Sequence, residues 1–333
     1  MTTPSPVTPT ASAASIDEIA SVGREVLDRV GQVVVGHRQP LTLALAAVLA
    51  GGHVLLEDVP GIGKTLAARS LAAALGLDFR RLQCTPDLLP ADVTGSFVYD
   101  PGQAEFVFHP GPLFTGLLLA DEINRTPPKT QSALLEAMQE RQVTVEGKTF
   151  PLPQPFTVLA TANPVEYEGT YPLPEAQLDR FLLRLAFGYP AHTEEVDVLR
   201  RRLGRRREEA EVDGVVDAAG LVRLQRGVEQ VDVDADVVDY CVRLATATRT
   251  HNLVEVGASP RGSLALLLVA RALAVLAGRD AVLPEDVKAC TVPALAHRLT
   301  LTVETWSSGT TAVEVVRDLL DRVPTPPSRR SGR

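Results

Sequence analysis

The chain has 333 residues, 45% of them hydrophobic and 22% charged, which is enough for one large domain or two of ordinary size. Its formal net charge of −8 argues against a general attraction to nucleic acid or to an anionic membrane surface. The longest apolar runs are shorter than the roughly 20 residues that a membrane span requires. Residues 1–15 lack the basic and apolar regions of a secretory signal. We therefore expect a cytoplasmic protein without a membrane span.

The chain contains three cysteines, Cys84, Cys241 and Cys290, which are isolated and lack CxxC or His/Cys metal-ligand spacing. They are expected to be small buried hydrophobic residues in a reducing compartment, not a disulfide or metal set.

Composition divides the chain into four parts. Residues 1–16 and 323–333 are tails rich in Pro, Ser and Thr, which are expected to be disordered. Residues 17–195 alternate short apolar runs with helical patterns, which is typical of a parallel sheet covered by helices on both faces. Residues 196–322 read as amphipathic helices and predict a helical second domain. The six arginines within 199–211 indicate a solvated helix face or linker, with a nucleic-acid or partner contact as the alternative.

The first predicted strand, 53–57, runs into the loop "DVPGIGKT" at 58–65, and a helix is predicted over 65–76. A strand, a glycine-containing loop and a helix in this order form a phosphate-binding loop. Gly61 and Gly63 allow backbone N–H groups to converge on phosphate oxygens, and the helix N-terminus favours negative charge. The segment therefore predicts a nucleotide site.

Lys64 is expected to neutralise the β- and γ-phosphates, and the Thr65 hydroxyl to help hold Mg²⁺. Asp58 stands where such loops usually begin with glycine. Because the N–H groups nearest the phosphates come from residues 61–65, this replacement is expected to be tolerated, with Pro60 stiffening the entry to the loop.

Two further apolar strands are predicted to end in polar groups at the same edge of the sheet. The strand over 116–121 delivers Asp121, which would position Mg²⁺, and Glu122, which would act as general base toward water. The strand over 156–163 ends at Asn163, whose amide could bind the attacking water or the γ-phosphate. A turn-forming Asn before proline is the alternative for that residue.

Two arginines are candidates for contacts with phosphate. Ser259 is predicted to be an N-cap, so Arg261 lies in a first helical turn, where a cation opposes the helix dipole unless an anion compensates. Arg180 lies beyond the third strand and could be an arginine finger that reaches a neighbouring subunit's γ-phosphate. The alternatives are simple solvent exposure for Arg261 and a salt bridge with Asp179 or Glu175 for Arg180.

The sequence resembles the MoxR group of AAA+ ATPases over residues 17–320. The resemblance is carried, in order, by "DVPGIGKT", "LLLADEINRTPPKTQSALLEAMQE", "LATANPVEYEGTYPLPEAQLDRF" and "GASPRGSLALLLVARALAVLAGRDAVLPEDV". An aspartate at the start of the phosphate loop is usual in that group. The resemblance implies an αβα ATPase core, a helical lid and assembly as a ring, expected to be hexameric. It also implies that residues 93–113 form a hairpin interrupting a core helix.

The same resemblance implies ATP and Mg²⁺ as cofactors and gives each motif a role. Thr65 and Asp121 would hold the metal. The catalytic residues would be Lys64, Glu122, Asn163 (sensor 1), Arg180 (arginine finger) and Arg261 (sensor 2). His37 and Ala162 stand where relatives more often have Gln, which puts only peripheral contacts in doubt. The candidate nucleotide-binding residues are Val35, Gly36, Pro60, Gly61, Ile62, Gly63, Lys64, Thr65, Leu66 and Arg261.

The function implied is chaperone-like remodelling or maturation of a protein partner, often a von Willebrand factor A (VWA) domain protein, including help in gaining metal. ATP is expected between core and lid. A DNA-associated or chelatase-type AAA+ motor is the main alternative. A small-molecule kinase would not need a neighbouring subunit, and a GTPase would need Asn-Lys-x-Asp. In this chain Arg, Pro and Leu follow the three asparagines, Asn124, Asn163 and Asn252, so the GTPase alternative fails.

Overall fold

The computed structural model describes residues 12–163, 169–206 and 211–327. Its centre is a parallel sheet of five strands in the order β2-β5-β8-β1-β9. The three strands predicted from their apolar runs are β1, β5 and β8, which are adjacent in the sheet. The other two are short or carry charged residues, and were not predicted. The strands are β1 (Val54–Glu57), β2 (Phe79–Gln83), β5 (Leu117–Asp121), β8 (Thr157–Ala162) and β9 (Leu183–Leu185).

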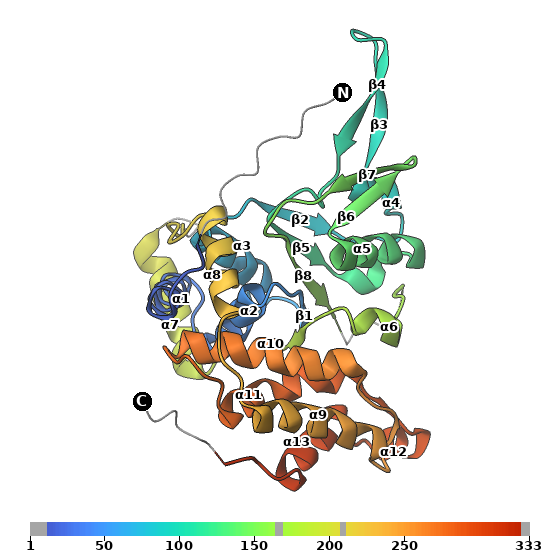
Figure 1. Cartoon of the computed structure of the whole chain (residues 1–333). Helices are drawn as coiled ribbons and strands as arrows, with labels where there is room; N and C mark the ends of the chain where they lie inside the picture. Colours follow the sequence, from blue (N-terminus) through green and yellow to red (C-terminus); the bar gives the residue numbers. More distant parts are fainter. Residues whose placement is uncertain (1–11, 164–168, 207–210, 328–333) are drawn as a thin grey trace.

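Helices cover both faces of the sheet, as the alternation of strands and helices predicted. Side chains alternate along a strand, so Val54 and Leu56 of β1 join one apolar cluster and Leu55 joins the other. Figure 1 shows the strands between the two helical layers. One layer contains α1 (Ile16–Gly31), α2 (Arg38–Leu49) and α3 (Lys64–Ala74), and the other contains α4 (Pro90–Thr94) and α5 (Pro128–Glu140).

Two antiparallel hairpins extend from the core. β3 (Gly95–Asp100) pairs with β4 (Glu105–Pro110) within the segment for which a hairpin was expected, and this hairpin projects from the body of the molecule (Figure 1). The second pairs β6 (Gln142–Val145) with β7 (Lys148–Pro151). The Phe108 and Phe150 rings stack at a centroid distance of 4.0 Å and join the two hairpins.

The C-terminal third of the chain forms a predominantly helical lid. Its helix α10 packs against α1 and α2 of the core as well as against α9 and α11, so one apolar cluster runs through both parts. A short antiparallel strand pair in the lid, β10 with β11, was not predicted. The lid elements are α8 (Ala218–Val228), α9 (Ala235–Thr250), β10 (Val254–Val256), α10 (Pro260–Leu276), α11 (Pro284–Leu295), β11 (Thr300–Leu301), α12 (Val303–Ser307) and α13 (Ala312–Arg322).

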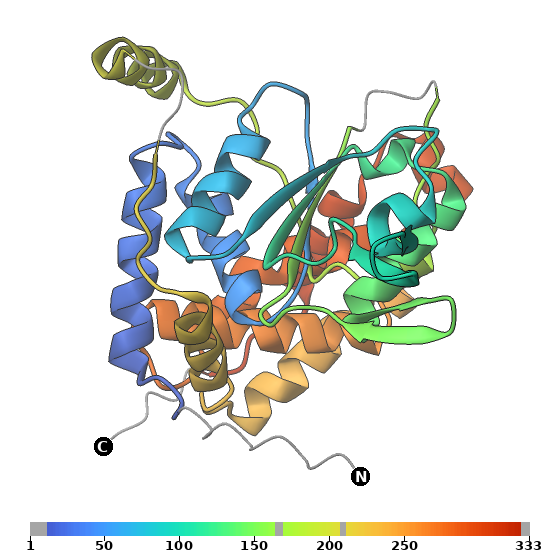
Figure 2. The ribbon, with the colours of Figure 1, turned by 90° about the horizontal axis from the view of Figure 1, so that it is seen from above.

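The connection between the two parts differs in detail from the expected boundary. The position between residues 195 and 196 lies in the first turn of α7 (His192–Arg205), which stands away from the body in Figure 2. This helix has no buried residue, in keeping with the solvated face predicted for its arginines. Residues 207–210 of the arginine-rich segment lie outside the described residues. The next helix, α8, packs against α1 and α2 of the core.

The inner ends of the two predicted disordered tails are held in place. Ala14 is buried, and its N–H donates to the Arg223 carbonyl of α8, so the chain is ordered before α1 begins. At the other end, Arg243 donates to the Pro324 carbonyl. The predicted tails are therefore too long at their inner ends, because backbone groups there find partners on the lid. Their outer parts, residues 1–11 and 328–333, lie outside the described residues.

All three cysteines are buried and free, as predicted from their spacing. Burial raises the pKa of Cys84 to about 11 and that of Cys241 to about 12, so these thiols stay protonated. Over the described ranges, no group of three or more His, Cys, Asp and Glu residues is arranged to bind a metal. Over the same ranges, no helix has both the length and the apolar character to cross a membrane.

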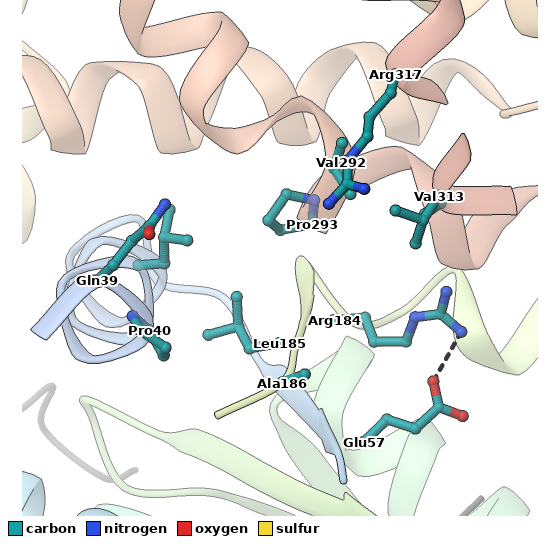
Figure 3. Close-up of a pocket in the computed structure, with 12 residues that line it drawn as sticks. Gln39, Pro40, Glu57, Arg184, Leu185, Ala186, Val292, Pro293, Val313 and Arg317 are labelled. Carbon is teal, nitrogen blue, oxygen red and sulfur yellow. Dashed lines mark ion pairs between the residues drawn. The ribbon is translucent and has the colours of Figure 1, made fainter. Parts of the chain in front are cut away.

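A cavity of about 380 Å³ lies between core and lid (Figure 3). On the core side, Glu57 of β1 forms an ion pair of 2.8 Å with Arg184 of the neighbouring strand β9. On the lid side, Arg317 of α13 extends toward the same space (Figure 3). This cavity contains no residue of the phosphate loop and is separate from the nucleotide site described below.

His53, just before β1, connects three elements inside the core. Its Nδ1 accepts the N–H of Val158 at 3.0 Å, so Nε2 carries the proton and donates to the Met138 carbonyl at 3.0 Å. Burial lowers the pKa of His53 from 6.5 to about 4. The neutral ring is therefore part of the folded structure.

Acid should destabilise the fold through His53. A folded-state pKa below the unfolded value favours folding above pH 6.5, and this contribution is lost as pH falls toward the folded value of about 4. We expect the free energy of unfolding to fall by roughly 3 kcal/mol across that window from this residue. Urea denaturation at a series of pH values measures it. His53→Gln should give a flatter curve, and parallel curves would contradict the assignment.

Candidate nucleotide-binding site

The predicted phosphate loop follows β1 at the carboxyl edge of the sheet. Gly61 and Gly63 adopt φ values of +84° and +86°, which L side chains rarely tolerate. Gly63 is the N-cap of α3, so the helix begins at Lys64 and its N-terminal N–H groups face the loop. The local sequence therefore builds an anion-binding helix start.

The structure brings the predicted phosphate and metal groups, together with the predicted catalytic residues Lys64, Glu122 and Asn163, around one cavity of about 380 Å³. Because β5, β8 and β1 are neighbours and parallel, their carboxyl ends meet at one edge of the sheet. The cavity is lined by Pro60, Gly61, Gly63, Lys64, Thr65, Leu66, Arg81, Asp121, Glu122, Thr161 and Asn163.

Oxygen ligands suited to Mg²⁺ are present in this cavity. Mg²⁺ is commonly held by one or two carboxylates together with substrate phosphates, so a large metal-binding cluster is unnecessary. The Thr65 hydroxyl and the Asp121 carboxylate supply such oxygens and face the same space as the start of α3. The donor set therefore fits the predicted metal.

Lys64 lies among acidic groups. Its Nζ donates to the Asp58 carbonyl at 2.7 Å. Burial lowers the pKa of Lys64, and the carboxylates of Asp58, Asp121 and Glu122 oppose that shift. A bound triphosphate would further favour the charged ammonium, because an opposite charge at close range stabilises it.

Asp121, the last residue of β5, and Glu122, the next residue, are positioned by residues that sequence analysis missed. The Thr161 hydroxyl donates to Asp121 Oδ1 at 2.6 Å and accepts the N–H of Glu122 at 2.8 Å. Arg81 of β2 forms an ion pair of 2.5 Å with Asp121 Oδ2. Glu122 itself has a left-handed φ of +59°, a strained conformation for a residue other than glycine.

The proposed base, Glu122, is already engaged on one oxygen. Its Oε2 accepts from Gln83 Nε2 at 3.1 Å and from Arg125 Nη1 at 3.0 Å. Gln83 is the last residue of β2. This strand was not predicted, because most of its residues are polar.

A second cavity, of about 470 Å³, adjoins the phosphate loop and shares Pro60, Gly61, Gly63 and Leu66 with the first. Its apolar walls suit a nucleotide base. Predicted residues Val35 and Ile62 line it, as do Tyr189 and Val198, which were not predicted. Gly36 is absent from this lining. It faces an adjoining crevice, where a Cβ would meet the Glu194 carboxylate at 2.6 Å.

Asp58 has a defined structural role that the loop pattern did not predict. Its Oδ2 accepts the N–H groups of Phe187 at 2.7 Å and Gly188 at 2.6 Å, just beyond β9. Its Oδ1 accepts the N–H of Val59 at 2.9 Å. The Asp58 carboxylate thus holds the phosphate loop against the segment that leads to Tyr189, which lines the cavity suited to the nucleotide base.

Arg180 and Arg261 lie together, but away from the phosphate loop. Both line a separate cavity of about 260 Å³ with Arg141, Arg298 and Asp179, so four arginines face one carboxylate. Arg261 Nη1 lies 3.9 Å from Asp179, a local counter-charge in place of the expected phosphate.

This cavity is at the amino edge of the sheet. Arg180 precedes β9, and the N–H of Leu182 donates to the His53 carbonyl just before β1. The phosphate loop instead follows β1. ATP was expected between core and lid, with Arg261 on its phosphates. Within one chain the structure differs, because the first turn of α10, which carries Arg261, packs at the amino edge and the phosphate loop lies at the carboxyl edge.

Within the described residues, the fold and site define a P-loop nucleotide-binding core with a helical lid. Residues 53–183 match the model for "ATPase family associated with various cellular activities (AAA)", and residues 246–319 match the AAA lid domain. A structure of a putative ATPase from Cytophaga hutchinsonii superposes with a TM-score of 0.87 at 39% identity, covering 94% of this chain and 97% of that one.

Curated relatives agree over most of the chain. It is 49% identical to the uncharacterized protein YeaC of Bacillus subtilis, covering 93% of this chain and 96% of the relative. It is 43% identical to Chaperone MoxR1 of Mycobacterium tuberculosis, covering 93% and 83%. The chain belongs to the MoxR family of AAA+ ATPases.

Replacing Asp58 with glycine, the residue usual at this position of the loop, should lower both stability and ATP affinity. In Asp58→Gly, the N–H groups of Phe187 and Gly188 lose their acceptor, and we expect a loss of about 1–3 kcal/mol in unfolding free energy. ATP affinity should fall as well, measured by fluorescent-nucleotide titration. Asp58→Asn keeps one acceptor oxygen and should be intermediate. A glycine variant as stable as wild type, with unchanged affinity, would contradict this role.

Proposed function

We propose that the protein hydrolyses ATP to ADP and phosphate in a cytoplasmic ring of identical subunits, expected to be hexameric. Each nucleotide site would be completed by Arg180 and Arg261 of a neighbour. The observation that carries the proposal is the cationic cavity at the amino edge of the sheet. Four arginines and one aspartate line this cavity. Their excess positive charge suits the triphosphate that a neighbouring subunit would hold at its carboxyl edge.

The roles of the residues follow from their positions. The phosphate loop and Lys64 would hold the β- and γ-phosphates, and Glu122 would take a proton from the attacking water. Asn163 lines the same cavity and would orient that water. Mg²⁺ held by Thr65 and Asp121 would neutralise phosphate charge.

The energy would be used to remodel or mature a protein partner, with a VWA-domain protein as the favoured class and metal insertion as one outcome. The similarity to a relative named Chaperone MoxR1 supports this use. The alternative is a chelatase-type or DNA-associated motor. It is supported by 29% identity to the magnesium-chelatase 38 kDa subunit of Cereibacter sphaeroides over 80% of this chain.

Mixed rings test the shared site. Lys64→Ala removes the phosphate contact and Arg180→Ala removes the neighbour's cation, so each variant alone should lose most ATPase activity. An equal mixture should recover up to about a quarter of wild-type turnover, since about one interface in four pairs two intact halves. Phosphate release measures it. Wild-type turnover by Arg180→Ala alone would contradict the shared-site proposal.

Glu122→Gln tests the base. The amide cannot accept the proton from water, so hydrolysis should fall by about 10²-fold or more. ATP binding should persist, because the phosphate loop is unchanged. Single-turnover hydrolysis and nucleotide titration separate the two effects. Hydrolysis near the wild-type rate would exclude Glu122 as the base. Partners captured by this variant with ATP, but not with ADP, would identify the client.

A further inference from the structure

Asp179 connects the core to the lid beside both proposed arginines. It follows the short helix α6 (Glu175–Leu178) and directly precedes Arg180. Its Oδ2 accepts the Ser259 hydroxyl at 2.9 Å, and its Oδ1 accepts Arg298 Nε at 2.8 Å. Arg261 Nη1 lies 3.9 Å from Oδ2. One core carboxylate therefore meets three lid residues.

Of these three lid residues, Arg298 is held most firmly by the core. Its side chain is only 3% exposed, and it donates to the carbonyls of Phe181 at 2.8 Å and Leu182 at 3.3 Å as well as to Asp179. Burial lowers the pKa of Arg298, and the Asp179 carboxylate opposes that shift. This guanidinium thus fixes the lid to the chain segment that carries Arg180 into β9.

Arg180 and Arg261 are held far less firmly than Arg298. In the part of the chain that the structure describes, the Arg180 guanidinium makes no hydrogen bond or ion pair, and its Nε is buried. Arg261 is about half exposed, and its hydrogen bond to Gln139 is long at 3.4 Å. Since Asp179 is committed mainly to Arg298 and Ser259, the guanidinium groups of Arg180 and Arg261 are available to another anion.

We propose that Asp179 is a positioning residue that sets Arg180 of the core and Arg261 of the lid as one paired receptor for a neighbouring subunit's triphosphate. This rests on the proposed shared site. Asp179 need not touch the nucleotide. It fixes the start of α10, through Ser259, against the segment before β9. The receptor is therefore complete only while the lid is docked on its own core, which makes lid docking in one subunit a condition for turnover in the next.

The test uses mixed rings in which one variant receives arginines and another donates them. Arg180→Ala is the receiver, because its phosphate loop is intact. Lys64→Ala is the reference donor. The test donor carries Lys64→Ala with Asp179→Asn, which keeps the shape but removes the charge. We expect the reference donor to restore phosphate release, and the test donor to restore about tenfold less or worse, since misplaced groups lose most of their effect.

Two controls separate positioning from folding. Asp179→Asn alone should bind ATP with wild-type affinity and should be rescued as a receiver by Lys64→Ala, which a misfolded chain would not be. A third donor adds Arg298→Gln to the test donor, so that no buried guanidinium is left without a counter-charge. Under the proposal it stays as weak as the test donor.

Each contrary outcome has a distinct meaning. A test donor as effective as Lys64→Ala overturns the positioning role. Recovery by the third donor also overturns it, because Asp179 would then serve only to neutralise Arg298. If Lys64→Ala itself fails to rescue Arg180→Ala, the shared site is wrong and the role of Asp179 falls with it.

Discussion

The direction of the strands is the constraint on which the rest of the structure depends. In a parallel sheet every segment that follows a strand lies at one edge, and every segment that precedes one lies at the other. Lys64 follows β1, whereas Arg180 precedes β9, which pairs with β1 in the register Val54 to Leu183. The strands separate these edges by roughly 13 Å. The phosphate loop and Arg180 therefore lie at opposite edges of one chain, which is why we propose that two copies share a site.

The charges at the two edges agree with this division. At the carboxyl edge, the cations Lys64 and Arg81 already match the carboxylates Asp121 and Glu122 in number. The amino edge carries an excess of arginine, with Asp179 largely committed to Arg298. Bound triphosphate would add negative charge at the carboxyl edge, and under the proposal the excess arginines of a neighbour's amino edge would compensate it.

Sequence patterns predicted the parts of the site that are local in the chain. The glycine loop, the acids at the end of β5 and Asn163 after β8 each follow a short apolar run that the sequence shows directly. The contacts of Asp58 were beyond those patterns, because its partners Phe187 and Gly188 are about 130 residues away and offer only backbone N–H groups. Arg81 was missed because β2 has too few apolar residues. The placement of Arg261 depends on how the lid docks, which helical periodicity does not encode.

The short strand β9 links the two half-sites through its own ends. At its start, Arg298 of the lid holds the carbonyls of Phe181 and Leu182, next to Arg180. Just past its end, Asp58 of the phosphate loop holds the N–H groups of Phe187 and Gly188. Only a few extended residues separate these contacts, and β1 pairs with them throughout. A shift of the lid at one end is therefore resisted by the phosphate loop at the other. Under the proposed shared site, this would make a subunit's own nucleotide and its contact with a neighbour's nucleotide depend on each other.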